Sequence, residues 1–252
     1  VMGYEERKQP FRPLIPDVRF IDFNNEFQLE QITEKTAAVI LETVQGGAGF
    51  IEPTNGYLTK VQRRCKDVGA LFILDEIQTG IGRTGTLFGF ENYHCAPDIL
   101  VCGKGLGGGM PIGAFIASNS MMSVLKDNPK LGHITTFGGH PVIAAAALAT
   151  LQEIASTNLM EEAIRKEKLI REHLKHPLIQ KIRGKGLMLA AIVPSKEIAD
   201  QVILDCQEQG LILFWLLFEP RAIRITPPLT ISDNEIIKGC KIMIDVLNKV
   251  SF

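Results

Sequence analysis

The sequence predicts an α/β fold, with a mainly parallel sheet in a large unit followed by a smaller α/β unit. Short apolar runs that suit buried strands recur along the chain, and segments with helical spacing separate them. The length of 252 residues and a hydrophobic content of 46% allow one or two packed domains. We expect a large domain over residues 1–155 and a small C-terminal domain over residues 156–252.

Four apolar runs predict the strands of the large domain, which helices should cover on both faces. A helix is expected between the first two strands because its apolar residues recur at helical spacing and it ends before Gly69. An alanine-rich helix should close the domain. The expected strands are residues 37–41, 70–74, 98–102 and 112–117, and the helices are residues 57–68 and 141–155.

The N-terminal segment contains Pro10, Pro13 and Pro16 and predicts a loop. From its opening at Val1 we expect that a further piece precedes it. In the small domain, Ser232 and Glu235 have the spacing of a capping box at the start of the last helix. The expected helices there are residues 159–174, 196–208 and 232–249, and the expected strands are residues 187–193, 211–216 and 223–226.

Composition excludes several classes of protein. A net charge of −1 gives no electrostatic basis for binding nucleic acid or an anionic membrane. No apolar run is long enough to span a bilayer. The five scattered cysteines include no CxxC pair, which predicts a reduced, cytoplasmic compartment and no metal site.

Polar residues follow three of the predicted strands, at the edge where parallel α/β sheets collect ligands. Glu42 and Gln45 follow the first strand, Asp75 and Gln78 the second, and Lys104 the third. An aspartate and a lysine at neighbouring strand ends suit pyridoxal 5'-phosphate (PLP), whose aldehyde needs an amine and whose ring nitrogen needs a carboxylate. Alternatively, the aspartate is a turn residue and the lysine a solvated surface charge.

The segment from Gly103 to Gly108 matches the G-x-G-x-x-G pattern of dinucleotide-binding proteins. That pattern binds pyrophosphate only where a helix begins directly after it. Here Gly109, Pro111 and Gly113 disfavour a helix, so an NAD-binding dehydrogenase is a weak alternative.

Two further features are candidate ligand contacts. Thr135 and Thr136 precede a Gly-Gly turn and a helix, where hydroxyl and backbone donors suit a phosphate, although a plain helix-entry loop has the same pattern. Arg224 lies on a short strand of the small domain, where a guanidinium can hold a substrate carboxylate or form a surface ion pair.

Together these segments resemble the class III aminotransferases of the ornithine, acetylornithine and 4-aminobutyrate type. The matching motifs are LDEIQTGIGRTG at residues 74–85, PDILVCGKGLGGGMPIG at 97–113, TTFGGHP at 135–141 and IRITPPL at 223–229. Their order and spacing also match the family. The resemblance implies a fold-type I homodimer that binds PLP and moves an amino group from such a donor to a 2-oxo acid such as 2-oxoglutarate.

The resemblance also implies roles for single residues. Lys104 would be the Schiff-base lysine and proton shuttle, and Asp75 would pair with the ring nitrogen. Ile77 would pack on one ring face, and Gln78 would hydrogen-bond the phenolic oxygen. Thr136, helped by Thr135, would reach the phosphate of the partner's cofactor, and Arg224 would bind the substrate carboxylate.

The chain departs from the family pattern in two places. The region with the phosphate cup and the second ring-stacking residue is absent from these residues. The family's Glu-Pro-Ile-Gln-Gly-Glu is here Glu42-Thr-Val-Gln-Gly-Gly47, so no glutamate at 47 is available to pair with Arg224.

Three alternatives to an aminotransferase remain at the level of sequence. Gln78 favours an ornithine- or aminobutyrate-like enzyme over a glutamate-semialdehyde mutase-like enzyme, the closest alternative within the same family. Outside it stand the NAD-binding dehydrogenase and a non-catalytic fragment or partner subunit.

Overall fold

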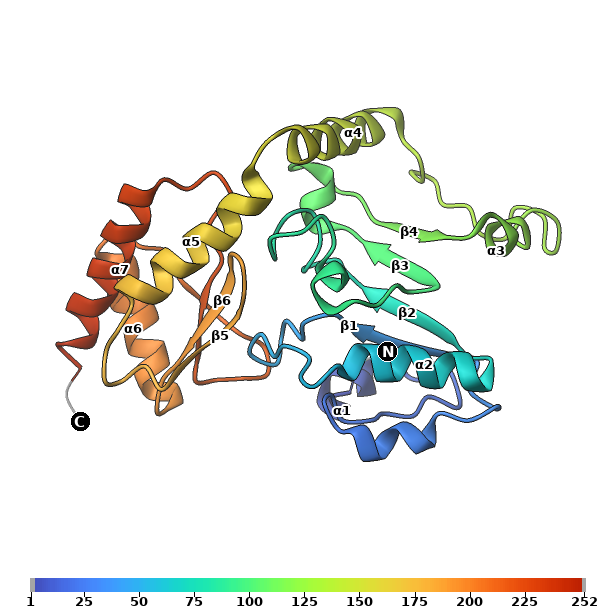
Figure 1. Cartoon of the computed structure of the whole chain (residues 1–252), viewed down its shortest axis with the longest axis horizontal. Coiled ribbons are helices and arrows are strands. Elements are labelled where there is room, and N and C mark those ends of the chain that lie inside the picture. Colours follow the sequence, from blue (N-terminus) through green and yellow to red (C-terminus); the bar gives the residue numbers. More distant parts are fainter. Residues whose placement is uncertain (1–2, 251–252) are drawn as a thin grey trace.

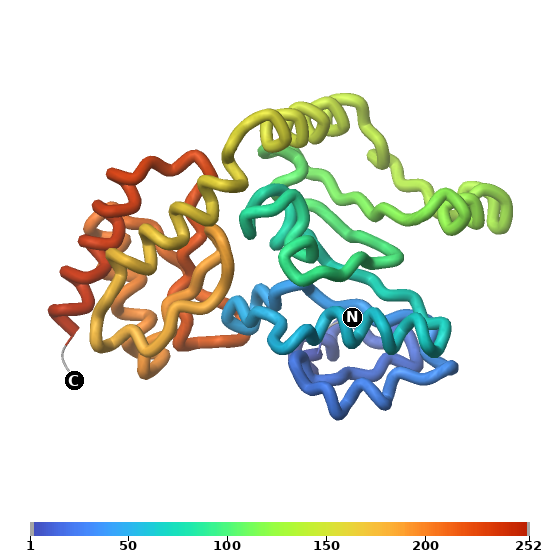
Figure 2. Tube along the Cα trace, in the orientation of Figure 1, coloured from blue at the N-terminus to red at the C-terminus, as the bar shows by residue number. Residues whose placement is uncertain are grey.

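The computed structural model describes residues 3–250 and shows two sheets, each with its own helices. Val1, Met2, Ser251 and Phe252 lie outside the described residues, and so does the expectation about what precedes Val1. The N-terminal segment lies beside the first sheet, and the described chain ends at the outer side of the second (Figures 1 and 2).

The first sheet has the strand order β1-β2-β3-β4 and confirms the mainly parallel prediction. The first three strands are parallel, whereas β4 runs antiparallel to β3. A parallel neighbour would need a long crossover, usually with a helix, and the 103–113 connection holds only a short turn. The strands are β1 (Ala38–Glu42), β2 (Leu71–Asp75), β3 (Ile99–Cys102) and β4 (Ala114–Ala117).

Within the described chain, this sheet is well buried on one face only. Phe72 and Leu74 of β2 are 1% and 0% exposed and pack under helix α2 (Tyr57–Val68). On the opposite face, Ile40 and Phe115 are 48% and 50% exposed. The prediction that helices cover both faces is therefore wrong for these residues, although the apolar strands that suggested it are present.

Short helices and turns join the strands of this half. Helix α2 ends as predicted, because Gly69 takes a φ of 76° and donates its N–H to the carbonyls of Cys65 and Lys66. The N-terminal segment is not simply a loop, since it forms two short helical turns. The remaining elements are α1 (Glu5–Lys8), η1 (Gln9–Phe11), η2 (Glu26–Gln31), η3 (Gly89–Tyr93), η4 (Lys104–Gly107), α3 (Asn119–Ser123) and α4 (Pro141–Ser156).

The second sheet has the order β5-β6-β8-β7 and is antiparallel throughout. All five residues of β6 are buried. The strand predicted at 211–216 shrinks to two residues, and β5 was not predicted. The strands are β5 (Lys181–Lys185), β6 (Met188–Ile192), β7 (Phe214–Trp215) and β8 (Ala222–Ile225), and the helices are α5 (Leu159–His173), α6 (Lys196–Glu208) and α7 (Asp233–Leu247).

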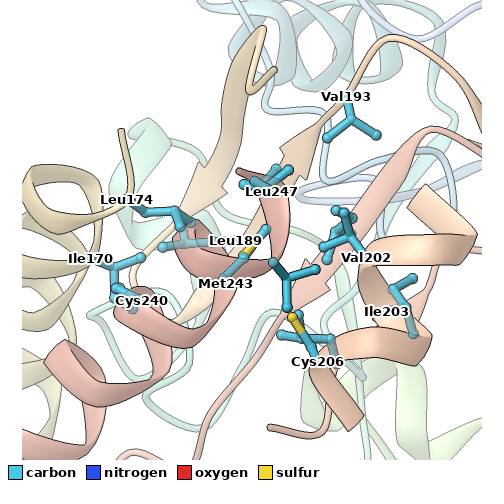
Figure 3. Packing of buried hydrophobic residues seen from close by; sticks show 14 of the residues in the cluster. Ile170, Leu174, Leu189, Val193, Val202, Ile203, Cys206, Cys240, Met243 and Leu247 are labelled. Atoms are coloured by element: carbon cyan, nitrogen blue, oxygen red, sulfur yellow. The ribbon is translucent and has the colours of Figure 1, made fainter. Parts of the chain in front are cut away.

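Three helices and this sheet enclose the main apolar core of the chain (Figure 3). Leu189 of β6 is fully buried and lies among Leu174, Met243 and Leu247 (Figure 3). The predicted capping box at the start of α7 is confirmed: the Ser232 hydroxyl accepts the Glu235 N–H, and the Glu235 carboxylate accepts the Ser232 N–H.

Helices α4 and α5 connect the two halves and meet at 68°. Their junction lies next to the predicted boundary at residue 155, which stays a prediction. Within residues 3–250, no single helix is long and apolar enough to cross a membrane, and α4 with α5 meets that test only as a bent pair.

Candidate functional site

The polar residues at the strand ends of the first sheet lie together, as the sequence predicted. Glu42 and Asp75 are register partners at the ends of β1 and β2, and Lys104 follows the end of β3. Burial, with a smaller contribution from the charge of Asp75, raises the pKa of Glu42. The N–H of Gly46 and the charge of Lys104 oppose that shift, so the three ionisable groups influence one another at one edge.

The turn after β2 places Ile77 and Gln78 beside this cluster. The Oδ1 atom of Asp75 accepts the Ile77 N–H at 2.9 Å, which fixes the carboxylate relative to the turn. A Cβ added to Gly103 would lie 3.5 Å from Ile77 Cγ2, so Ile77 packs next to the residue that precedes Lys104. A Cβ on Gly46 would come within 2.3 Å of Gln78 Oε1, so only glycine fits there without movement.

Lys104 is exposed and has a left-handed backbone with a φ of 40°, which is unusual for a residue with a side chain. It opens the η4 turn, and the buried Leu106 of that turn packs with Ala147 and Ile154 of α4. No α-helix follows, since the chain passes from η4 to β4. The dinucleotide fingerprint is therefore incomplete, as the sequence analysis argued.

A buried carboxylate that the sequence motifs did not predict lies next to Asp75. Glu76 is 0% exposed and accepts hydrogen bonds from the hydroxyls of Thr43 and Thr79 and from the N–H groups of Gly89 and Phe90. Burial raises the pKa of Glu76. The carboxylate thereby ties the long loop after β2 to the strand ends, a role that its position after Asp75 did not signal.

A second missed residue is Arg83, which joins the loop after β2 to the second sheet. Its Nη1 donates to the carbonyls of Leu187 at 3.1 Å and Pro227 at 2.6 Å. Burial, with a smaller contribution from the nearby charge of Arg224, lowers the pKa of Arg83 to about 10. Arg224 itself donates from Nε to Thr226 Oγ1 at 2.9 Å. Two guanidiniums therefore lie together where the two halves meet.

Thr135 and Thr136 do not join this cluster within the described chain. Both are exposed in the segment that runs from α3 to α4 (Figure 1), and no hydrogen bond within residues 3–250 joins either of them to Asp75, Gln78 or Lys104. The helix that follows is capped by His140, whose Nδ1 accepts the Val142 N–H at 3.3 Å.

Residue 47 lies against Phe218. The carbonyl of Gly47 accepts the Phe218 N–H at 2.9 Å, and a Cβ on Gly47 would lie 2.9 Å from Phe218 Cδ2. A side chain at residue 47 would therefore have to displace Phe218 before it could pair with Arg224. No group of three or more metal-ligating side chains occurs among residues 3–250.

Comparison with known proteins identifies the family of the chain. The sequence matches the family Aminotransferase class-III over residues 6–247. It is 38% identical over 256 residues to the acetylornithine aminotransferase of Caldanaerobacter subterraneus subsp. tengcongensis, and the match covers 99% of this chain and 63% of that protein. The chain thus spans less than two thirds of the length of that curated relative.

Solved structures show the same fold. The ornithine aminotransferase of Toxoplasma gondii is 33% identical with a TM-score of 0.88, covering 95% of this chain and 57% of its own. The acetylornithine aminotransferase of Elizabethkingia anophelis is 35% identical with a TM-score of 0.85, covering 96% of this chain and 62% of its own. The predicted fold-type I architecture is thereby confirmed, and the chain belongs to the class III aminotransferases.

Proposed function

We propose that the protein is a PLP-dependent aminotransferase that moves an amino group from an ornithine-, acetylornithine- or aminobutyrate-like donor to a 2-oxo acid such as 2-oxoglutarate. The carrying observation is the meeting of Lys104 and Asp75 at neighbouring strand ends, with Ile77 and Gln78 beside them. In the structure of the Toxoplasma gondii relative, PLP partially occupies the active site.

The residues present suit this cofactor. Lys104 offers an exposed amine. Asp75 uses one oxygen on the Ile77 N–H, and the described contacts leave the other free for a protonated ring nitrogen. Ile77 supplies an apolar surface next to Gly103, and Gln78 a side-chain amide near Glu42. An amine, a free carboxylate oxygen and an apolar surface are what the aldehyde, nitrogen and ring face of PLP require.

When bound, PLP supplies an aldehyde and an electron-poor ring that accepts the electron pair of a broken C–H bond. Lys104 would hold the aldehyde and, as a free base, would take a proton from the amine-bearing carbon of the donor and deliver it to the carbon that carried the aldehyde oxygen. Asp75 would keep the ring nitrogen protonated, and Gln78 would donate to the phenolic oxygen. Arg224 binds the donor carboxylate through paired N–H groups.

We also propose that the active form is a homodimer in which Thr136, with Thr135, contacts the phosphate in the partner's site. Large apolar side chains from β4 to the first turn of α4 are 50–73% exposed, which is a typical feature of a surface that another subunit covers. They are Phe115, Ile116, Val124, Leu131, Ile134, Phe137 and Val142. The cytoplasm is the proposed compartment, because all five cysteines are free and buried.

The test is borohydride reduction of the purified holoenzyme followed by peptide mapping and donor assays. The expected result is a pyridoxyl label on Lys104, absent in Lys104→Ala, together with amine transfer to 2-oxoglutarate. A label on another lysine would overturn the assignment. A label on Lys104 without transfer would point to a mutase-like enzyme of the same family.

Mixed dimers test the shared site. One subunit carries Lys104→Ala and the other Thr136→Val. A homodimer of either variant is expected to be inactive. The mixed dimer then regains one complete site and measurable activity. No recovery on mixing would show that Thr136 does not act across the interface.

A further inference from the structure

The loop after β2, residues 76–91, is one of the places where the first half of the molecule contacts the second. A Cβ added to Gly85 would lie 2.3 Å from Ile164 Cδ1 on α5. A Cβ added to Gly186, in the turn between β5 and β6, would lie 2.6 Å from the carbonyl oxygen of Arg83. The two halves are therefore packed at this loop with no room for a further side chain.

Arg83 joins this loop to two strands of the second half at once. Its Nη1 donates to the Leu187 carbonyl at 3.1 Å, just before β6, and to the Pro227 carbonyl at 2.6 Å, just after β8. Its own carbonyl accepts the Leu187 N–H at 3.0 Å. Strands β6 and β8 are antiparallel neighbours in which Ala190 pairs with Arg224. The guanidinium of Arg83 therefore fixes, relative to the first half, one end of the strand pair that carries Arg224.

The side chain of Arg224 is oriented by a residue next to that contact. Its Nε donates to Thr226 Oγ1 at 2.9 Å, and Pro227 follows Thr226 directly. Within residues 3–250, the hydrogen bonds and ion pairs leave both Nη atoms of Arg224 available. A guanidinium binds a carboxylate through two parallel N–H groups only when its orientation is set.

Lys166 offers a comparison, because it holds the segment after β8 from within the second half. The ammonium group of this buried α5 residue donates to the Leu229 carbonyl at 2.8 Å. Both Lys166 and Arg83 thus contact a carbonyl of the segment that follows Arg224. The Lys166 contact joins two parts of the second half, whereas the Arg83 contact joins that half to the first.

We propose that Arg83 is a positioning residue that sets, through the Pro227 carbonyl and the Thr226 hydroxyl, where the guanidinium of Arg224 meets the substrate carboxylate. The amine of Lys104 belongs to one half and the guanidinium of Arg224 to the other. A substrate can engage both only if the two halves keep a fixed relation, so the contact of Arg83 decides how well the carboxylate is bound. This inference rests on the proposed function and adds a residue that does not touch the substrate.

The experiment measures steady-state kinetics of the holoenzyme with 2-oxoglutarate as the acceptor and the donor identified in the donor assays. Arg83→Lys keeps the charge but lacks the fork that reaches both carbonyls. The expected KM for 2-oxoglutarate rises at least about tenfold, equivalent to about 1.4 kcal/mol, while kcat stays within about twofold, because binding is lost equally from the ground state and the transition state. Thr226→Val keeps the shape of the side chain, removes the acceptor for Nε and should raise the KM as well.

Lys166→Met is the matched control. It also removes a cation from a carbonyl of the segment after β8, so it should lower the melting temperature, but the KM for 2-oxoglutarate should stay within about twofold of the wild type. A double-mutant cycle adds a second criterion. Because Arg83 acts through Arg224, Arg83→Lys should raise the KM no further once Arg224→Lys is present.

An unchanged KM in Arg83→Lys or in Thr226→Val would overturn the inference, and the second variant decides if the first does not fold. An equal rise in Lys166→Met, or effects of Arg83→Lys and Arg224→Lys that simply add, would reduce Arg83 to a structural contact. Borohydride labelling of Lys104 keeps the two proposals apart. Loss of the label in Arg83→Lys alone would show that Arg83 supports the whole site, against the inference, whereas a wild type without label or amine transfer would mean that the proposed function itself has failed.

Discussion

Strand β6 of the second sheet is buried along its whole length, whereas β1 of the first sheet has no fully buried residue. The second sheet is closed by three helices around a large apolar core. The first ends in partly buried Asp75 and Gln78 and in the exposed, glycine-flanked Lys104. The difference suggests that the second half supplies most of the folding free energy, while the strand ends of the first supply the proposed chemistry.

The largest expected effect on activity is at Asp75. Asparagine keeps the oxygen that accepts the Ile77 N–H, so the turn should hold, but it no longer stabilises a protonated ring nitrogen. We expect Asp75→Asn to lower kcat at least about 10²-fold, the scale of losing one electrostatic contact to developing charge. The melting temperature should change little. Near-native turnover would reduce Asp75 to a turn residue.

The largest expected effect on stability is in the second half. Leu189 is fully buried, and Leu189→Ala should lower the free energy of unfolding by about 2–5 kcal/mol through lost burial and a cavity. The matched control is Ile40→Ala on the exposed face of β1, with an expected loss within about 0.5 kcal/mol. Urea denaturation of both variants measures the two losses in unfolding free energy. Equal losses would contradict the greater contribution of the second half to stability.

Features that depend on local sequence were predictable, whereas features that depend on distant contacts were not. Apolar runs predicted β1 to β4 because period and composition report burial directly, and the strand-end rule then located Lys104 and Asp75. Strand β5 escaped because Lys181-Ile-Arg-Gly-Lys185 is mostly charged and has a glycine. The antiparallel direction of β4 could have been predicted from the short connection between β3 and β4.

Other features depend on contacts between distant parts of the chain. Arg83 is buried by Leu187 and Pro227, which lie more than 100 positions further on, and nothing in its own motif indicates them. The uncovered face of the first sheet was also not predictable, because an apolar strand composition does not indicate which segment packs on each face.

Glu76 provides a pH-dependent test within the first half. Glu76→Gln replaces one carboxylate oxygen by an NH2 group, which must face the N–H of Gly89 or Phe90. We expect a loss of about 1–3 kcal/mol in unfolding free energy. The control is Glu153→Gln, at an exposed position on α4, which should cost almost nothing.

The sign of the pH effect follows from the raised pKa of Glu76. The folded state binds the Glu76 proton more tightly than the unfolded state, in which the pKa of Glu76 is near 4.5. The stabilisation is complete below that pH and is lost as pH rises through the folded value. The difference in unfolding free energy between wild type and Glu76→Gln should therefore decrease as the pH is raised from 4 toward neutrality. A difference that grows over this range would mean that the four donors lower the pKa instead.

The smallest expected effect concerns the backbone of Lys104, where the proposed chemistry and stability oppose each other. A residue with a Cβ at a φ of 40° is strained, by about 1–2 kcal/mol in the left-handed region. Glycine removes that strain but costs about 0.4–1 kcal/mol through the freedom of the unfolded chain. Lys104→Gly should therefore be more stable than Lys104→Ala by up to about 1.6 kcal/mol, although both lack the amine. Urea midpoints measured without cofactor give the comparison.

Ala144→Gly in the exposed part of α4 is the matched control, since there the same change should destabilise by about 1 kcal/mol. If glycine is less stable than alanine at both positions, the backbone of Lys104 is not strained. The left-handed turn would then not reduce the stability of the fold.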